Sequence, residues 1–127
     1  MRSRWERRVA EYLDNTPEVV SWSYERKKVW YYNPVRKKRT FYLPDFWAKT
    51  KDGKEHILEV KPYKETHPPR RTRGKSERTW LYENATYQIN QAKWAACQDY
   101  CKRIRADFQI VTEREIYRNK KERRLKG

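Results

Sequence analysis

The sequence predicts a mixed α/β domain with its elements in the order α-β-β-β-α-β. Two observations predict it: apolar residues recur at helical spacing near residue 9 and again over residues 80–104, and runs rich in β-branched and aromatic residues lie between and after them. Aromatic residues make up 15% of the 127 residues, more than a disordered chain of this charge carries. We expect one domain over residues 1–117 and a basic tail over 118–127.

The first helix is expected to begin after Ser3, because Ser3 and Glu6 have the spacing of a capping box. An apolar stripe at helical spacing follows, with Glu6 at its edge; it consists of Trp5, Val9, Tyr12 and Leu13. The polar and proline-containing residues 15–17 are expected to end this helix.

The middle of the chain is expected to form strands. Residues 19–33 predict one long strand or two short ones, and a basic turn follows at residues 34–38. In the next predicted strand, residues 39–50, Pro44 lacks a backbone donor and favours a sheet edge or a bulge. Asp52-Gly53 predicts a tight hairpin turn before a strand that ends at Pro62. The hairpin would bring residue 45 toward residues 59–61.

A loop, a helix and a last strand are expected to complete the domain. Residues 63–79 hold six basic residues and show no periodicity, which predicts a functional or mobile loop. Residues 107–112 predict the last strand, and a helical turn is expected after it. The long helix over residues 80–104 would pack on the sheet through a stripe of Tyr82, Ala85, Ile89, Ala92, Ala96 and Tyr100.

The net charge of +15 indicates a polyanionic partner, and nucleic acid is the favoured one. We expect non-sequence-specific contact with the backbone of double-stranded DNA. Charge runs that only solvate the surface are the alternative. The expected DNA-binding residues are Arg36, Lys37, Lys38, Arg39, Lys64, Arg70, Arg71, Arg73, Lys75 and Lys93.

The composition argues against a membrane protein and against a disulfide-stabilised one. No segment approaches the ~20 apolar residues of a membrane span, and the N-terminus lacks the apolar run of a signal peptide. Cys97 and Cys101 lie four apart on a predicted helix, where a disulfide is geometrically poor. We expect both to be ordinary helix residues in a reducing compartment.

Three charged residues mark a candidate site in the predicted hairpin. Side chains alternate along a strand, so Glu59 and Lys61 share a face, and Asp45 can lie opposite them. Two neighbouring carboxylates repel unless a cation lies between them. Oxygen ligands suit Mg²⁺, with Mn²⁺ as a second choice, and a lysine can orient water or stabilise charge on a phosphate. The group therefore predicts phosphodiester hydrolysis.

Each of these residues also has a purely structural interpretation. Asp45 could cap a bulge at Pro44, and Glu59 and Lys61 could form an exposed ion pair of little energetic value. Glu6 could serve only the capping box. Gln91 could simply solvate its helix face.

The spacing Pro44-Asp45 followed by Glu59-Val60-Lys61 resembles the PD-(D/E)xK pattern, and the element order resembles the restriction-endonuclease-like core of that superfamily, with its mixed sheet. Several segments further resemble the head-completion nucleases of contractile-tailed phages, over about residues 2–116. The most specific is "NQAKWAACQDYC" followed by "FQIVTE". That block argues against a transposon-end cutter or a junction resolvase of the same superfamily.

The resemblance implies a metal-dependent endodeoxyribonuclease that completes the phage head after DNA packaging. It would act in the host cytoplasm during assembly, or in the virion head or neck, with portal or head–tail connector proteins as partners. A structural DNA-binding connector that has a nuclease fold and little or no cleavage activity is the alternative.

The resemblance also implies residue roles. Asp45 and Glu59 would bind Mg²⁺ with the backbone carbonyl of Val60, and Lys61 would orient the water. Glu6 would reach the metal directly or through water. Gln91 and Lys93 would lie beside the site and contact a phosphate or the nucleophile.

Overall fold

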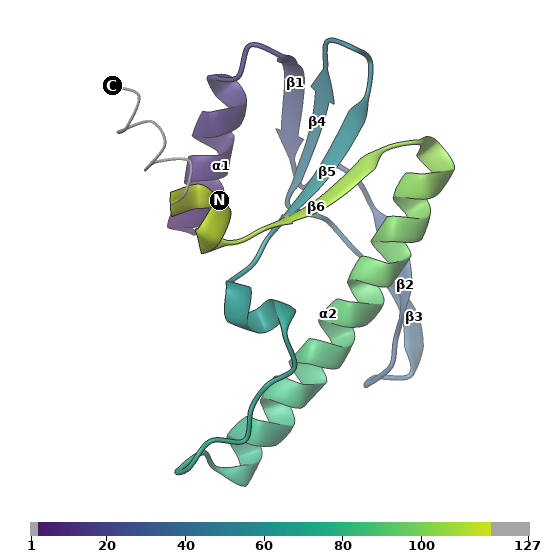
Figure 1. The fold of residues 1–127 in the computed structure, drawn as a ribbon. Coiled ribbons are helices and arrows are strands. Elements are labelled where there is room, and N and C mark those ends of the chain that lie inside the picture. The colour runs from purple at the N-terminus through teal and green to yellow at the C-terminus, as the bar shows by residue number, and fades with distance from the viewer. Residues whose placement is uncertain (1–2, 118–127) are drawn as a thin grey trace.

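The structure is a computed structural model that describes residues 3–117; the expected basic tail lies outside the described residues. Figure 1 shows the elements in chain order. They are α1 (Arg4–Asp14), β1 (Val19–Tyr24), β2 (Val29–Asn33), β3 (Lys38–Tyr42), β4 (Phe46–Thr50), β5 (Glu55–Val60), the 3-10 turn η1 (Tyr63–Thr66), α2 (Glu77–Ile104) and β6 (Asp107–Val111).

The strands form two sheets. The larger sheet has the order β1-β4-β5-β6, with β1 and β5 antiparallel to β4 and with β6 parallel to β5. Strands β2 and β3 pair antiparallel in a separate ribbon between β1 and β4 in the chain. Apart from this ribbon, the element order is α-β-β-β-α-β. The predicted mixed α/β fold with a mixed sheet is confirmed.

The single strand predicted over residues 39–50 is wrong, because this segment is two strands in different sheets. Strand β3 ends at Tyr42 and β4 begins at Phe46. Pro44, which lies between them, is fully buried and has no N–H to donate to a ladder. The chain therefore leaves one sheet and enters the other at Leu43–Asp45. Residues 19–33 are two short strands, which was one of the two alternatives.

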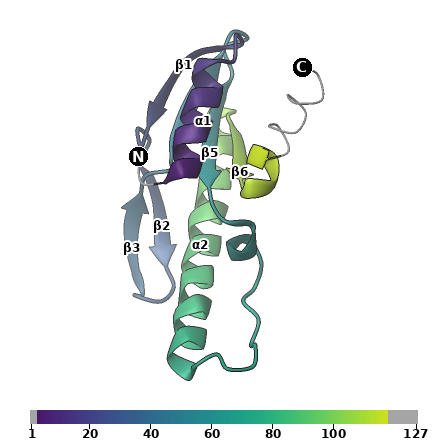
Figure 2. The ribbon, with the colours of Figure 1, turned by 90° about the vertical axis from the view of Figure 1, so that its left-hand side faces the viewer.

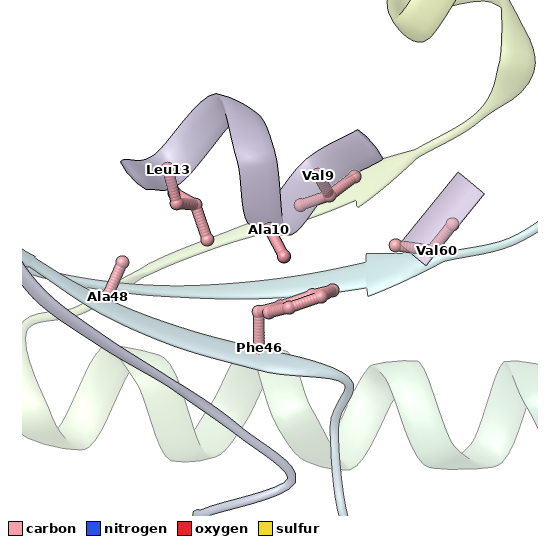
Figure 3. Packing of buried hydrophobic residues seen from close by; sticks show 6 residues of the cluster. All are labelled: Val9, Ala10, Leu13, Phe46, Ala48 and Val60. Atoms are coloured by element: carbon pink, nitrogen blue, oxygen red, sulfur yellow. The ribbon is translucent and has the colours of Figure 1, made fainter. Parts of the chain in front are cut away.

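The larger sheet is covered on both faces. Phe46 and Ala48 of β4 pack with Val60 against Val9, Ala10 and Leu13 of α1, and Figure 3 shows these side chains between α1 and the sheet. Trp47, which points to the opposite face, packs with Ile57 against Cys97 and Cys101 of α2 and Val29 of β2. This alternation explains why β4 is apolar at three successive positions.

The apolar stripe predicted for α2 is confirmed near the C-terminal end of the helix, where Ala96 and Tyr100 pack against the core, but not near its N-terminal end. Asn90, Trp94, Cys97 and Cys101 are buried, whereas Tyr82 is 72% exposed. Figure 1 gives the reason: the N-terminal half of α2 runs past the sheet, so apolar residues there have no sheet to pack on. Both cysteines are free and buried, as expected for ordinary helix residues.

The segment predicted as a loop over residues 63–79 is shorter and better anchored than expected. Helix α2 begins at Glu77, because the Ser76 hydroxyl caps it by accepting from the Thr79 N–H at 3.1 Å. At the other end, Glu113 accepts from the Tyr63 N–H at 2.7 Å. Glu113 opens the helical turn that was expected after the last strand. Within residues 3–117, no helix is long and apolar enough to cross a membrane.

Candidate active site

The two segments predicted to carry the site meet at one end of the larger sheet. Asp45 lies in the connection that enters β4, and its carboxylate accepts from the Val60 N–H at 2.7 Å. The carbonyl oxygen of Asp45 accepts from the Glu25 N–H, just after β1, at 2.9 Å. Asp45 is therefore held from both neighbouring strands. The predicted approach of residue 45 to residues 59–61 is confirmed.

Glu59 lies inside the protein beside Asp45. Glu59 is 4% exposed. Its pKa is raised to about 8, first by burial and second by the negative charge of Asp45. Lys61 and Lys93 act in the opposite direction and lower the pKa of Glu59. An ionised Glu59 in this position needs a cation nearby.

The pKa of Asp45 is also raised by some neighbours and lowered by others. Burial is the largest cause that raises its pKa, and the carboxylates of Glu6 and Glu25 add to it. The Val60 amide and Lys61 lower the pKa of Asp45. Lys61 therefore acts on both acids, while its own N–H donates to the carbonyl of Val111 on β6 at 3.0 Å.

Glu6 lies near this pair, on the first turn of α1. Its N–H donates to the Ser3 hydroxyl at 3.1 Å, so the predicted cap is formed. Its carboxylate accepts hydrogen bonds from the Ser3 hydroxyl at 3.3 Å and from the Tyr24 hydroxyl. Burial and this bond to Glu6 raise the pKa of Tyr24, so Tyr24 remains a donor at neutral pH.

Tyr24→Phe tests how much this buried bond contributes. Glu6 is 8% exposed, and a buried acceptor that loses a donor carries a desolvation penalty, so we expect about 1–3 kcal/mol less unfolding free energy. Urea denaturation followed by circular dichroism measures it. Tyr12→Phe, at a tyrosine 44% exposed on α1, is the matched control and should be neutral. Equal stability of the two variants would contradict the prediction.

The donor chemistry fits a hard divalent cation at Asp45 and Glu59. Both carboxylates have raised pKa values because they are largely removed from water, Glu59 more than Asp45, and lie close to negative charge. A cation between them would relieve this. Within residues 3–117, no three Asp, Glu, His or Cys side chains gather closely enough to hold an ion. Glu6 therefore does not form a three-carboxylate group with Asp45 and Glu59. Its carboxylate is instead hydrogen-bonded to Ser3 and Tyr24. Its predicted metal role stays a prediction.

The two helix residues expected beside the site differ in their surroundings. Lys93 lowers the pKa of Glu59, and its ammonium lies 5.3 Å from the ring centre of Tyr42. Gln91 is exposed and lines a cavity of about 250 Å³ with Thr66, Trp94 and Ile110. Its predicted contact with phosphate or the nucleophile is untested.

Three site neighbours were missed by the sequence reasoning: Tyr24, Glu25 and Tyr42. The hydroxyl of Tyr42 donates to the Lys93 carbonyl at 3.3 Å. Burial, then Cys97 and Glu59, raises the pKa of Tyr42. Only the place of Tyr42 three residues before Asp45 could have pointed to it.

The predicted DNA-binding residues lie on both sides of α2. Arg36 and Lys37 form the tip of the β2–β3 ribbon, and Lys38 and Arg39 begin β3; all four are exposed. Lys64, Arg70 and Arg73 are exposed on the segment between β5 and α2. In the same segment Arg71 pairs with Glu77 at 2.6 Å and Lys75 with Glu83 at 2.8 Å. These two ion pairs connect the segment to α2. Contact of any of these residues with DNA stays a prediction.

This fold, with the buried Glu59 and the half-buried Asp45 near a lysine, is of the PD-(D/E)xK nuclease type. Residues 16–113 match the family described as TnsA-like endonuclease N terminal, and the chain belongs to that family. It is also 33% identical, over 115 residues, to the head completion nuclease of Enterobacteria phage T4; the match covers 88% of this chain and 77% of that protein. This confirms the resemblance to head-completion nucleases. No solved structure matches the chain.

Proposed function

We propose that this protein is a Mg²⁺-dependent endonuclease that hydrolyses phosphodiester bonds of double-stranded DNA during phage head completion. The observation that carries the proposal is that the charge of the half-buried Asp45 raises the pKa of the buried Glu59 at one end of the sheet, with Lys61 acting electrostatically on both. Two like charges that are largely removed from water destabilise a fold. Binding of a catalytic metal ion would explain why the protein has both carboxylates at this place.

Each residue has a distinct task in this proposal. Asp45 and Glu59, with the carbonyl of Val60, would hold Mg²⁺ or, as a second choice, Mn²⁺. When bound, such an ion supplies a Lewis acid for a phosphate oxygen and lowers the pKa of a bound water. Lys61 orients the attacking water and stabilises negative charge on the phosphate. Lys93, which also acts on Glu59, adds a second positive charge.

The surroundings support DNA as the substrate. The net charge of +15 and the exposed cations on both sides of α2 suit a phosphate backbone, which needs no base-specific contact. The relative from phage T4 is named for head completion. For this chain we therefore propose action in the host cytoplasm during assembly, or in the virion head or neck, with portal or head–tail connector proteins as partners.

A metal-dependence assay tests the proposal. Purified protein is incubated with circular and linear double-stranded DNA in Mg²⁺, in Mn²⁺ or in chelator, and the products are separated by electrophoresis. We expect cutting in Mg²⁺, with circles opened, and none in chelator, because two carboxylates without a cation cannot activate water. DNA binding should persist in chelator. Binding without any cutting, under all ion conditions, would favour a structural connector instead.

A further inference from the structure

We propose that the outward face of the β2–β3 ribbon is a stacking surface for unpaired DNA bases next to the cut site. This inference rests on the proposed DNA cleavage and specifies its substrate: DNA in which paired and unpaired segments meet. The surface is defined by Trp30, Tyr32 and Phe41, with the cations Lys28 and Arg39, and is called the aromatic face below.

Strand alternation separates the two faces of the ribbon. Val29, Tyr31 and Asn33 of β2 are buried, and β2 is the part of the ribbon that packs on α2. The intervening Trp30 and Tyr32 point outward and are 50% and 58% exposed, and Phe41 of β3 is 42% exposed. The ribbon therefore already has a packed face, and the aromatic residues on the other face contribute little to the core.

The aromatic face is contiguous and cationic. Trp30 and Phe41 are register partners, and their ring centres lie 5.3 Å apart. The Lys28 ammonium lies 4.2 Å from the Phe41 ring centre, and the Arg39 guanidinium 5.6 Å from that of Trp30. Exposed rings flanked by cations suit bases joined by phosphates, since every base has a face that can stack. A duplex hides these faces, so unpaired bases are the matching ligand.

The position of the ribbon connects this face to the acids. Phe41 is four residues before Asp45 in the chain, which limits their Cα separation to roughly 14 Å. That length equals about four base steps along one DNA strand. Figures 1 and 2 show the ribbon and the basic segment between β5 and α2 on opposite sides of α2. Unpaired bases on the ribbon would thus lie within a few nucleotides of the cleaved bond.

Binding assays in chelator test the inference without any need for cleavage. Fluorescence anisotropy compares a blunt duplex, a forked duplex with unpaired arms and a single strand, all with the same number of phosphates. The wild type is expected to prefer the fork to the blunt duplex by at least about fivefold. Trp30→Ala combined with Phe41→Ala should weaken fork binding by roughly five- to hundredfold and leave blunt-duplex binding within about twofold.

Two controls separate stacking from damage to the fold. Tyr12→Ala removes an exposed aromatic residue from α1 and should change no affinity. A fluorescent adenine analogue in the unpaired arm should be quenched when the wild type binds and not when the double variant binds. Thermal melting checks that the double variant is folded. Tyr32→Ala, a single substitution on the same face, serves as a further test variant.

The outcomes distinguish this inference from the proposed function. Equal wild-type affinity for fork and blunt duplex would overturn it, as would an equal loss on both DNAs in the double variant. If the wild type cuts no DNA in Mg²⁺ but the fork preference depends on Trp30 and Phe41, the proposed nuclease activity fails. The aromatic face then stands as a DNA-binding surface.

Discussion

Asp45→Asn is expected to reduce DNA cleavage in Mg²⁺ on the order of 10³-fold or more, while DNA binding persists. The substitution keeps the size of the side chain and its ability to accept from the Val60 N–H, which Asp45 does at 2.7 Å. It removes a negative charge from the proposed metal position. A thousandfold loss corresponds to about 4 kcal/mol of transition-state stabilisation, a magnitude typical of a lost electrostatic contact at a reacting centre.

Asp99→Asn is the matched control, because it makes the same chemical change at an exposed position of α2. Initial cleavage rates of both variants are measured on one linear DNA, with DNA affinity measured in chelator. The control should cut at the wild-type rate. Cleavage by Asp45→Asn within about tenfold of the control would remove Asp45 from the site, whatever happens to binding.

Glu59→Gln is expected to stabilise the metal-free protein at alkaline pH. The pKa of Glu59 is raised from 4.5 to about 8 in the folded state. Between these values the unfolded state binds fewer protons, so the contribution of Glu59 to stability falls as pH rises from about 4.5 to about 8. A pKa difference of this size changes the free energy of unfolding by at most about 5 kcal/mol. The variant should therefore match the wild type near pH 4.5 and exceed it increasingly toward pH 8.

Urea denaturation of both proteins in chelator, at pH steps between 4.5 and 8.5, measures this difference. Glu18→Gln, at an exposed glutamate, is the control and should show no such trend. Mg²⁺ should stabilise the wild type at pH 8 and not Glu59→Gln, since the ion would bind the ionised carboxylate. A wild-type advantage that grows with pH in chelator would contradict the assignment of Glu59 as a buried acid with a raised pKa.

Local sequence patterns were sufficient for the parts of the fold that depend on short-range interactions. Ser3 and Glu6 predicted the start of α1, and Asp52-Gly53 predicted the β4–β5 hairpin, where Gly53 has a φ of +83° that favours glycine. The hairpin in turn predicted the approach of Asp45 to Glu59. These features depend on residues close in sequence or paired across a short turn.

Other features depend on which surfaces meet in three dimensions. The buried line of α2 runs through Asn90, Trp94, Cys97 and Cys101 because β2 and the sheet reach only part of that helix. The change of sheets at Pro44 looked like a strand irregularity in the sequence. Tyr24 carried no signal of its place near the acids, since only the packing of distant segments brings it there.

The sequence by itself determined the element types, the charged residues of the candidate site and the strong positive charge, because periodicity, turn residues and composition are local properties. Only the tertiary structure decided that Glu6 is bonded to Tyr24, that ion pairs of Arg71 and Lys75 connect the basic segment to α2, and that the ribbon turns an aromatic face outward. Each of these follows from burial and from contacts between segments far apart in the chain, which local patterns do not encode.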